Sequence, residues 1–159
     1  MKELFLSIPS LIIFLHVISA VLWVGGMIAI RFAVHYSMQN IEEPKIKLAR
    51  TLENLKRFFN MVIPAILVLL ITAIMMILGL ELKSTPLYKV ALIKEVIWTV
   101  MTLIFIYIYI KRVKAQKYFD NGEVALAKAT LEPIAKIFIP TNIVLGLIAI
   151  FLGVTLRGF

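Results

Sequence analysis

The chain has 159 residues, of which 62% are hydrophobic and only 16% are charged, and its mean hydropathy is +0.99. Soluble domains carry about 25% charged residues, so this composition predicts an integral membrane protein and excludes soluble enzymes and disordered tails. The absence of Cys excludes disulfides, thiolate metal sites and iron–sulfur clusters. The net charge of +8 then indicates a face that meets anionic lipid and the cytoplasm, and we expect no nucleic-acid partner.

Four apolar stretches each reach the roughly 20 residues that a helix needs to cross a bilayer. They cover residues 4–30, 58–80, 87–110 and 137–156. Together they predict an all-α integral membrane protein, folded as one antiparallel four-helix bundle and one domain over 1–159. The first helix continues beyond the membrane over about 31–40, until Glu42-Glu43-Pro44 stops it. The second begins with an amphipathic extension over about 45–57, in which apolar residues recur at helical spacing: Ile46, Leu48, Ala49, Leu52, Leu55 and Phe59.

Basic residues are concentrated in two of the three connections. Between the first two spans lie Arg31, Lys45, Lys47, Arg50, Lys56 and Arg57, and between the last two lie Lys111, Arg112, Lys114, Lys117, Lys128 and Lys136. The opposite side has only Lys2, Lys83, Lys89 and Arg157. Cytoplasmic connections of membrane proteins are rich in Lys and Arg, so we expect both basic connections inside and both termini outside.

Counting along the helices predicts a layer of polar side chains in the outer half of the bilayer. His16 lies 15 residues before Arg31, which is about 22 Å at 1.5 Å per residue. The same counting from the basic edges of the second and third spans places four more residues at this depth: Met75, Met76, Lys94 and Glu95.

His16 is the candidate metal ligand of this layer. One interpretation is a histidine that joins two helices through a hydrogen bond. The other is an axial ligand to haem b, or a copper ligand, because a neutral imidazole offers a lone pair without bringing charge into lipid. Trp23 and Met27 share its helix face and are the predicted cofactor contacts. The Gly25-Gly26 pair leaves room for a flat macrocycle or for close helix packing.

Three further residues complete the candidate site. His35 lies 19 residues after His16, about 28 Å along the helix, so it is either a second metal ligand on the cytoplasmic side or an interfacial residue. Arg31 suits a haem propionate, because guanidinium binds carboxylates in bidentate fashion, or it sets the topology. Lys94 either extends to the surface or pairs with a ligand carboxylate or moves a proton. We therefore name Lys94 and Arg31 as candidate catalytic and cofactor-binding residues.

The fourth span contains a stripe of small residues. Asn142, Gly146, Ala149 and Gly153 recur at helical spacing. Small side chains let helices approach closely in membranes, so the stripe predicts a packing groove.

The first helix also resembles a known family. Its segment Leu15–Met27, LHVISAVLWVGGM, resembles the first helix of the CopD and HemJ group of bacterial membrane proteins, which share a His, then a Trp, then a Gly pair or Ala-Gly. The segment Arg31–His35 resembles the stretch that closes this helix in HemJ-type protoporphyrinogen oxidases. The span around Lys94 and the ending Val154–Phe159 are similar to the HemJ third helix and its Lys-Pro-Phe end.

The resemblance implies a haem b-binding redox protein of the bacterial inner membrane, with His16 in the place of the family's first-helix His. A porphyrinogen or a quinone would be its redox partner, and an enzyme of this kind would be an oxidoreductase of protoporphyrinogen oxidase type. CopD-type members are associated with copper resistance and uptake, so a copper carrier is the second hypothesis. The third is a non-catalytic helper subunit whose small-residue stripes dock another membrane protein or a further copy of the chain.

Overall fold

The computed structural model describes residues 1–156. Arg157 and the last residues of the segment compared with HemJ proteins lie outside the described residues. Within the described chain all regular secondary structure is helical, and four continuous helices are long and apolar enough to cross a membrane. They span Pro9–Gln39, Pro44–Gly79, Tyr88–Asp120 and Val124–Thr155. The predicted all-α membrane bundle is therefore confirmed, and its apolar helices fit a lipid bilayer.

Two of the long helices contain π-helical turns. The first consists of α2 (Pro9–Ala20), the π turn η1 (Val21–Gly25), α3 (Gly26–Ala29), the π turn η2 (Ile30–Val34) and α4 (His35–Gln39). The fourth consists of α7 (Val124–Pro133), the π turn η4 (Ile134–Phe138) and α8 (Ile139–Thr155). The other two, α5 (Pro44–Gly79) and α6 (Tyr88–Asp120), are uninterrupted. A short 3₁₀ helix, η3 (Leu82–Ser84), lies in the connection between them.

The N-terminus differs from the prediction, because the first span begins at Pro9 and not at Leu4. Residues Lys2–Ser7 form a separate short helix, α1. Ile8 breaks the helix with φ −139° and ψ 53°, since the residue before a proline disfavours the helical conformation. The ring of Phe5 occupies the space that a side chain at Gly79 would need, so α1 folds back onto the end of α5.

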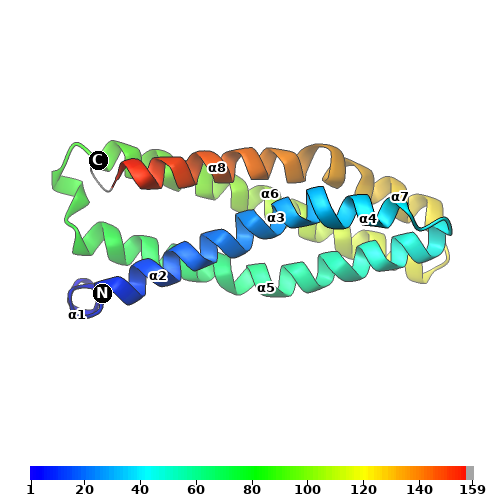
Figure 1. Cartoon of the computed structure of the whole chain (residues 1–159), viewed down its shortest axis with the longest axis horizontal. Helices are drawn as coiled ribbons and strands as arrows, with labels where there is room; N and C mark the ends of the chain where they lie inside the picture. The colour runs from blue at the N-terminus through cyan, green and yellow to red at the C-terminus, as the bar shows by residue number, and fades with distance from the viewer. Residues whose placement is uncertain (157–159) are drawn as a thin grey trace.

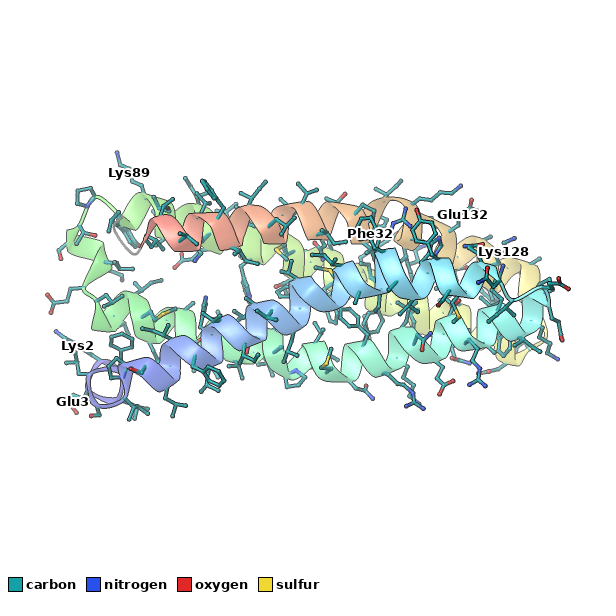
Figure 2. All side chains as sticks on the ribbon, viewed as in Figure 1. Lys2, Glu3, Phe32, Lys89, Lys128 and Glu132 are labelled. Atoms are coloured by element: carbon teal, nitrogen blue, oxygen red, sulfur yellow. The ribbon has the colours of Figure 1, made fainter. Side chains whose placement is uncertain are left out.

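The four long helices run antiparallel and create two distinct ends (Figure 1). At one end, here called the basic end, lie the connections 40–43 and 121–123, the latter with Gly122 at φ +82°. At the other, the terminal end, lie α1, the connection 80–87 and the end of α8 (Figure 1). Figure 2 shows Lys128 near the basic end, and Lys2 and Lys89 at the terminal end.

The main core extends from the middle of the bundle to the basic end. Its largest fully buried apolar side chains belong to three different long helices: Trp23, Leu52, Val62 and Ile134. Phe105 contacts both Trp23 and Phe59 edge to face, with centroid distances of 6.2 and 5.2 Å. The predicted amphipathic extension of the second span is confirmed at Leu48, Leu52, Leu55 and Phe59, which are buried. Ile46, expected on the same face, is exposed.

Small residues allow the helices of this core to pack closely, and one arginine joins two of them. A Cβ on Gly146 would lie 2.6 Å from Val24 Cγ2, so this part of the predicted small-residue stripe is a packing groove. A Cβ on Gly26 would lie 2.5 Å from the Phe58 ring, so Gly26 serves close helix packing. Arg112 of α6 donates to the Leu52 carbonyl of α5 at 3.1 and 3.4 Å and joins these two helices near the basic end.

The terminal end is packed differently. There α2 lies against α5 and α6 against α8, and the ribbons of the two pairs diverge (Figure 1). No side chain is buried over 92–100 of α6 or over 147–156 of the last helix. A small cluster of Phe5, Ile12 and Met75 joins α1, α2 and α5. His16 and Lys94, both half-buried, lie in this region.

Candidate functional site

The site begins with a hydrogen bond between the first two spans. His16 on α2 is half-buried, and its Nδ1 lies 2.9 Å from Thr72 Oγ1 on α5. Thr72 is itself buried and donates its hydroxyl hydrogen to the Val68 carbonyl at 2.6 Å. Because this hydrogen is already used, the Thr72 oxygen accepts from His16 Nδ1–H. The imidazole is thereby held as the tautomer in which Nε2 keeps its lone pair.

Lys94 is the ionisable residue on the other helix pair. It is half-buried on α6, and its Nζ would be 2.9 Å from a Cβ on Gly153, so the glycine provides the space for the ammonium group between α6 and α8. No carboxylate in the described part of the chain pairs with Lys94. An unpaired cation in a spanning helix is costly, which indicates a functional role.

Trp98 adds a second hydrogen-bond donor one turn from Lys94. Its indole Nε1 is buried and has no hydrogen-bond partner among the described residues. Buried N–H groups usually have an acceptor, but Trp23 Nε1 in the main core also has none, so the missing acceptor alone does not mark a ligand site. His16 on α2 and Lys94 and Trp98 on α6 are thus polar groups of these two helices whose bonding capacity the described residues leave partly unused.

The structure separates the other predicted residues from this site. Trp23 and Met27 are packed in the main core, with exposed fractions of 1% and 3%. Met75 and Met76 support α1, and Glu95 is exposed on the outside of α6. Of the predicted layer, therefore, His16 and Lys94 are the polar residues that are half-buried in the bundle.

Arg31 and His35 meet in a different place, toward the basic end. Both line a cavity of about 80 Å³ between the first, second and fourth long helices. Thr51 and Asn54 of α5 and the apolar side chains of η4 complete its wall. Arg31 and His35 therefore share a cavity that His16 does not line, whereas their roles stay predictions.

The donors at His16 and the space around them are two tests of whether haem could bind there. A histidine with a free ring nitrogen is of the kind that binds haem iron. Cavities that enclose a ligand of this size measure about 300–1,000 Å³. Two pockets of the described chain measure about 250 and 80 Å³, and neither is lined by His16. Neither of these pockets therefore encloses a macrocycle held by His16.

Sequence reasoning missed Thr72 and Trp98. Thr72 had a usable signal, because it is a polar residue in an apolar run and lies one turn from Met75, which was assigned to the depth of His16. Trp98 follows Lys94 by one helical turn, but its missing hydrogen-bond partner is visible only in three dimensions. Comparison of the chain with protein-family models, with curated proteins and with solved structures finds no match.

Proposed function

We propose that this protein binds haem b in a membrane and transfers electrons, with His16 as an axial ligand. One observation carries the proposal: the Thr72 hydroxyl fixes the His16 ring so that Nε2 is free to bind a metal. Histidines that bind metals are commonly oriented in this way through their other ring nitrogen. The resemblance of residues 15–27 to the first helix of CopD and HemJ proteins supports the same assignment.

The number of protein donors favours haem over copper. In haem the porphyrin supplies four nitrogens, so one histidine is enough to anchor the iron. A copper ion without a macrocycle needs several His, Met or Cys donors at one point. His35 lies about 28 Å from His16 along the helix, so it cannot join His16 as a donor to one ion within a subunit.

Each residue of the site has a task in this proposal. Bound haem supplies one-electron chemistry. Thr72 holds the imidazole in its orientation, and Lys94 and Trp98 donate to a propionate that would otherwise be unpaired in a desolvated place. Lys94 is also the group at this site that can transfer a proton to or from a porphyrinogen or a quinone. Oxidation of a porphyrinogen at this site would make the protein an oxidoreductase of protoporphyrinogen oxidase type.

The expected sidedness is part of the proposal. The basic end would face the cytoplasm and the terminal end the outside of the bacterial inner membrane, because bases are concentrated at the basic end. A Cys placed at Ser84 should react with an impermeant thiol reagent added to whole cells, and a Cys at Asn121 should react only after lysis. The reverse pattern of labelling would overturn this orientation.

The absorption spectrum of the purified protein tests the function. The protein should show a Soret band and sharp bands on reduction, and His16→Ala should lose them. His35→Ala is the matched control, since it removes the other histidine of the chain and should keep the bands. A full haem complement with an unchanged spectrum in His16→Ala would refute the ligation. Bound copper without haem would support the copper-carrier hypothesis. A colourless, metal-free protein would support the hypothesis of a helper subunit.

A further inference from the structure

The cavity that contains Arg31 and His35 points to a second binding site, separate from His16. Its polar lining contains nitrogen donors and no carboxylate: the Arg31 guanidinium, the His35 imidazole and the Asn54 amide. The side-chain amide nitrogen of Gln39 lies 3.3 Å from His35 Nε2 and donates to it, which leaves the hydrogen of His35 on Nδ1. A lining with nitrogen donors and no carboxylate favours the binding of an oxyanion.

Arg31 has no acceptor of its own. It lies over the edge of Phe32 at 6.0 Å from the ring centroid, and no carboxylate of the described chain forms an ion pair with it. Glu132, which lies in α7 two residues before η4, pairs with Lys136 instead. A half-buried guanidinium at the edge of a spanning helix therefore has its donors available for an external group.

The backbone around the cavity supplies an independent indication. The π turn η2 contributes Arg31, and the π turn η4 contributes Ile134 and Ala135, so two π turns from different long helices face the same space. π turns occur frequently at functional sites, because they displace side chains from the regular helical register. Here they open a gap between helices that are otherwise closely packed.

The size and wall of the cavity define the ligand. A volume of about 80 Å³ holds a single phosphate or carboxylate group, given that one water occupies about 30 Å³ in the liquid, and it is too small for a porphyrin. The rest of the wall is apolar and includes Leu131 and Ile139. Basic pockets between spanning helices bind the head groups of anionic lipids.

We propose that this cavity binds the phosphate of an anionic phospholipid, with Arg31 as its main ligand. The acyl chains would extend along the apolar surface of the fourth helix, where Ile137 is 58% exposed. The inference does not rest on haem binding, because the two sites share no residue.

Native mass spectrometry of the delipidated full chain, titrated with phosphatidylglycerol or phosphatidylcholine in a mild detergent, tests this site. The protein should retain one phosphatidylglycerol in preference to phosphatidylcholine. Arg31→Gln should weaken this binding about tenfold or more, because it removes charge-assisted hydrogen bonds. Ala135→Leu should weaken it similarly by filling the cavity without changing charge. Arg57→Gln and Ala129→Leu are matched controls on exposed positions and should bind as the unmodified chain does.

Two results would overturn the proposal. One is phosphatidylglycerol binding at unmodified affinity in both Arg31→Gln and Ala135→Leu. The other is displacement of the lipid by millimolar inorganic phosphate, which would identify a soluble oxyanion as the ligand. The helical circular dichroism of each variant serves as the check on folding.

Discussion

The two halves of the bundle differ in how their helices pack. From Trp23 to the basic end, side chains of all four long helices meet in one continuous core. Toward the terminal end the helices associate as two pairs, and His16 and Lys94 lie between them, half-buried. Packing in the first half leaves little free space, although Trp23 Nε1 and Asn142 Oδ1 are buried there without a hydrogen-bond partner among the described residues. The second half keeps the Lys94 cation half-buried, with no carboxylate of the described chain paired with it.

This difference indicates a division of labour. Apolar contacts in the basic half stabilise the fold, whereas the candidate site in the terminal half is loosely packed. Binding regions of proteins often belong to the less stable parts of a fold. The 80 Å³ cavity is the exception within the basic half, and it occurs where two π turns interrupt regular packing.

The largest expected effect comes from the core of the basic half. Leu52 has an exposed fraction of 1%, so Leu52→Ala should lower the free energy of unfolding by about 2–5 kcal/mol. Leu147→Ala in the terminal half, where the side chain is 49% exposed, should change it by less than about 0.5 kcal/mol. Thermal or denaturant unfolding in detergent measures both. Equal losses would show that the two halves are equally well packed.

A pair of glycines in the fourth helix sharpens the comparison. Gly146→Ala should cost about 1–3 kcal/mol, since the new methyl group would meet the β-branched Val24 side chain. Gly153→Ala should cost much less, because the neighbouring atom is the mobile end of Lys94. The same unfolding experiment compares them. A larger loss for Gly153→Ala would mean that the terminal half is rigid.

The hydrogen bond of His16 should have a smaller effect on stability. Thr72→Val keeps the shape of the side chain but removes the acceptor of His16 Nδ1–H, at a cost of about 0.5–1.5 kcal/mol. If His16 binds haem, its reduction potential should also shift, because the imidazole loses its orienting partner. Thr99→Val is the control, since the Thr99 hydroxyl bonds only within its own helix. An unchanged potential together with unchanged stability would contradict the role of Thr72.

The smallest effect concerns the surface of the terminal end. The Lys2 ammonium donates a hydrogen bond to Glu81 and holds the pKa of that carboxyl below its ordinary 4.5. A carboxyl with a lowered pKa stabilises the fold above 4.5 and loses this contribution as pH falls through its folded-state pKa. NMR titration of labelled Glu should show a low midpoint that returns toward 4.5 in Lys2→Met. An unaltered midpoint would show that the ion pair is absent in solution.

Much of the fold follows from local sequence. The apolar runs determine four spans, Glu42-Glu43-Pro44 ends the first helix, and Asn121-Gly122 forms the turn after α6. These features depend on short-range physics, namely hydrophobic length, the missing N–H of proline and the left-handed conformation that glycine tolerates. The depth of His16 and Lys94 followed in the same way from the rise of 1.5 Å per residue.

The tertiary structure alone decided which side chains meet. In a spanning helix the faces toward lipid and toward the core are both apolar, so the sequence pattern does not reveal how each helix is rotated about its axis. Rotation made Thr72 the partner of His16 and turned Lys94 inward and Glu95 outward. The π turns η2 and η4 moved Arg31 and Ala135 to one cavity. Sequence therefore determined which residues share a depth, and packing between helices determined which of them share a site.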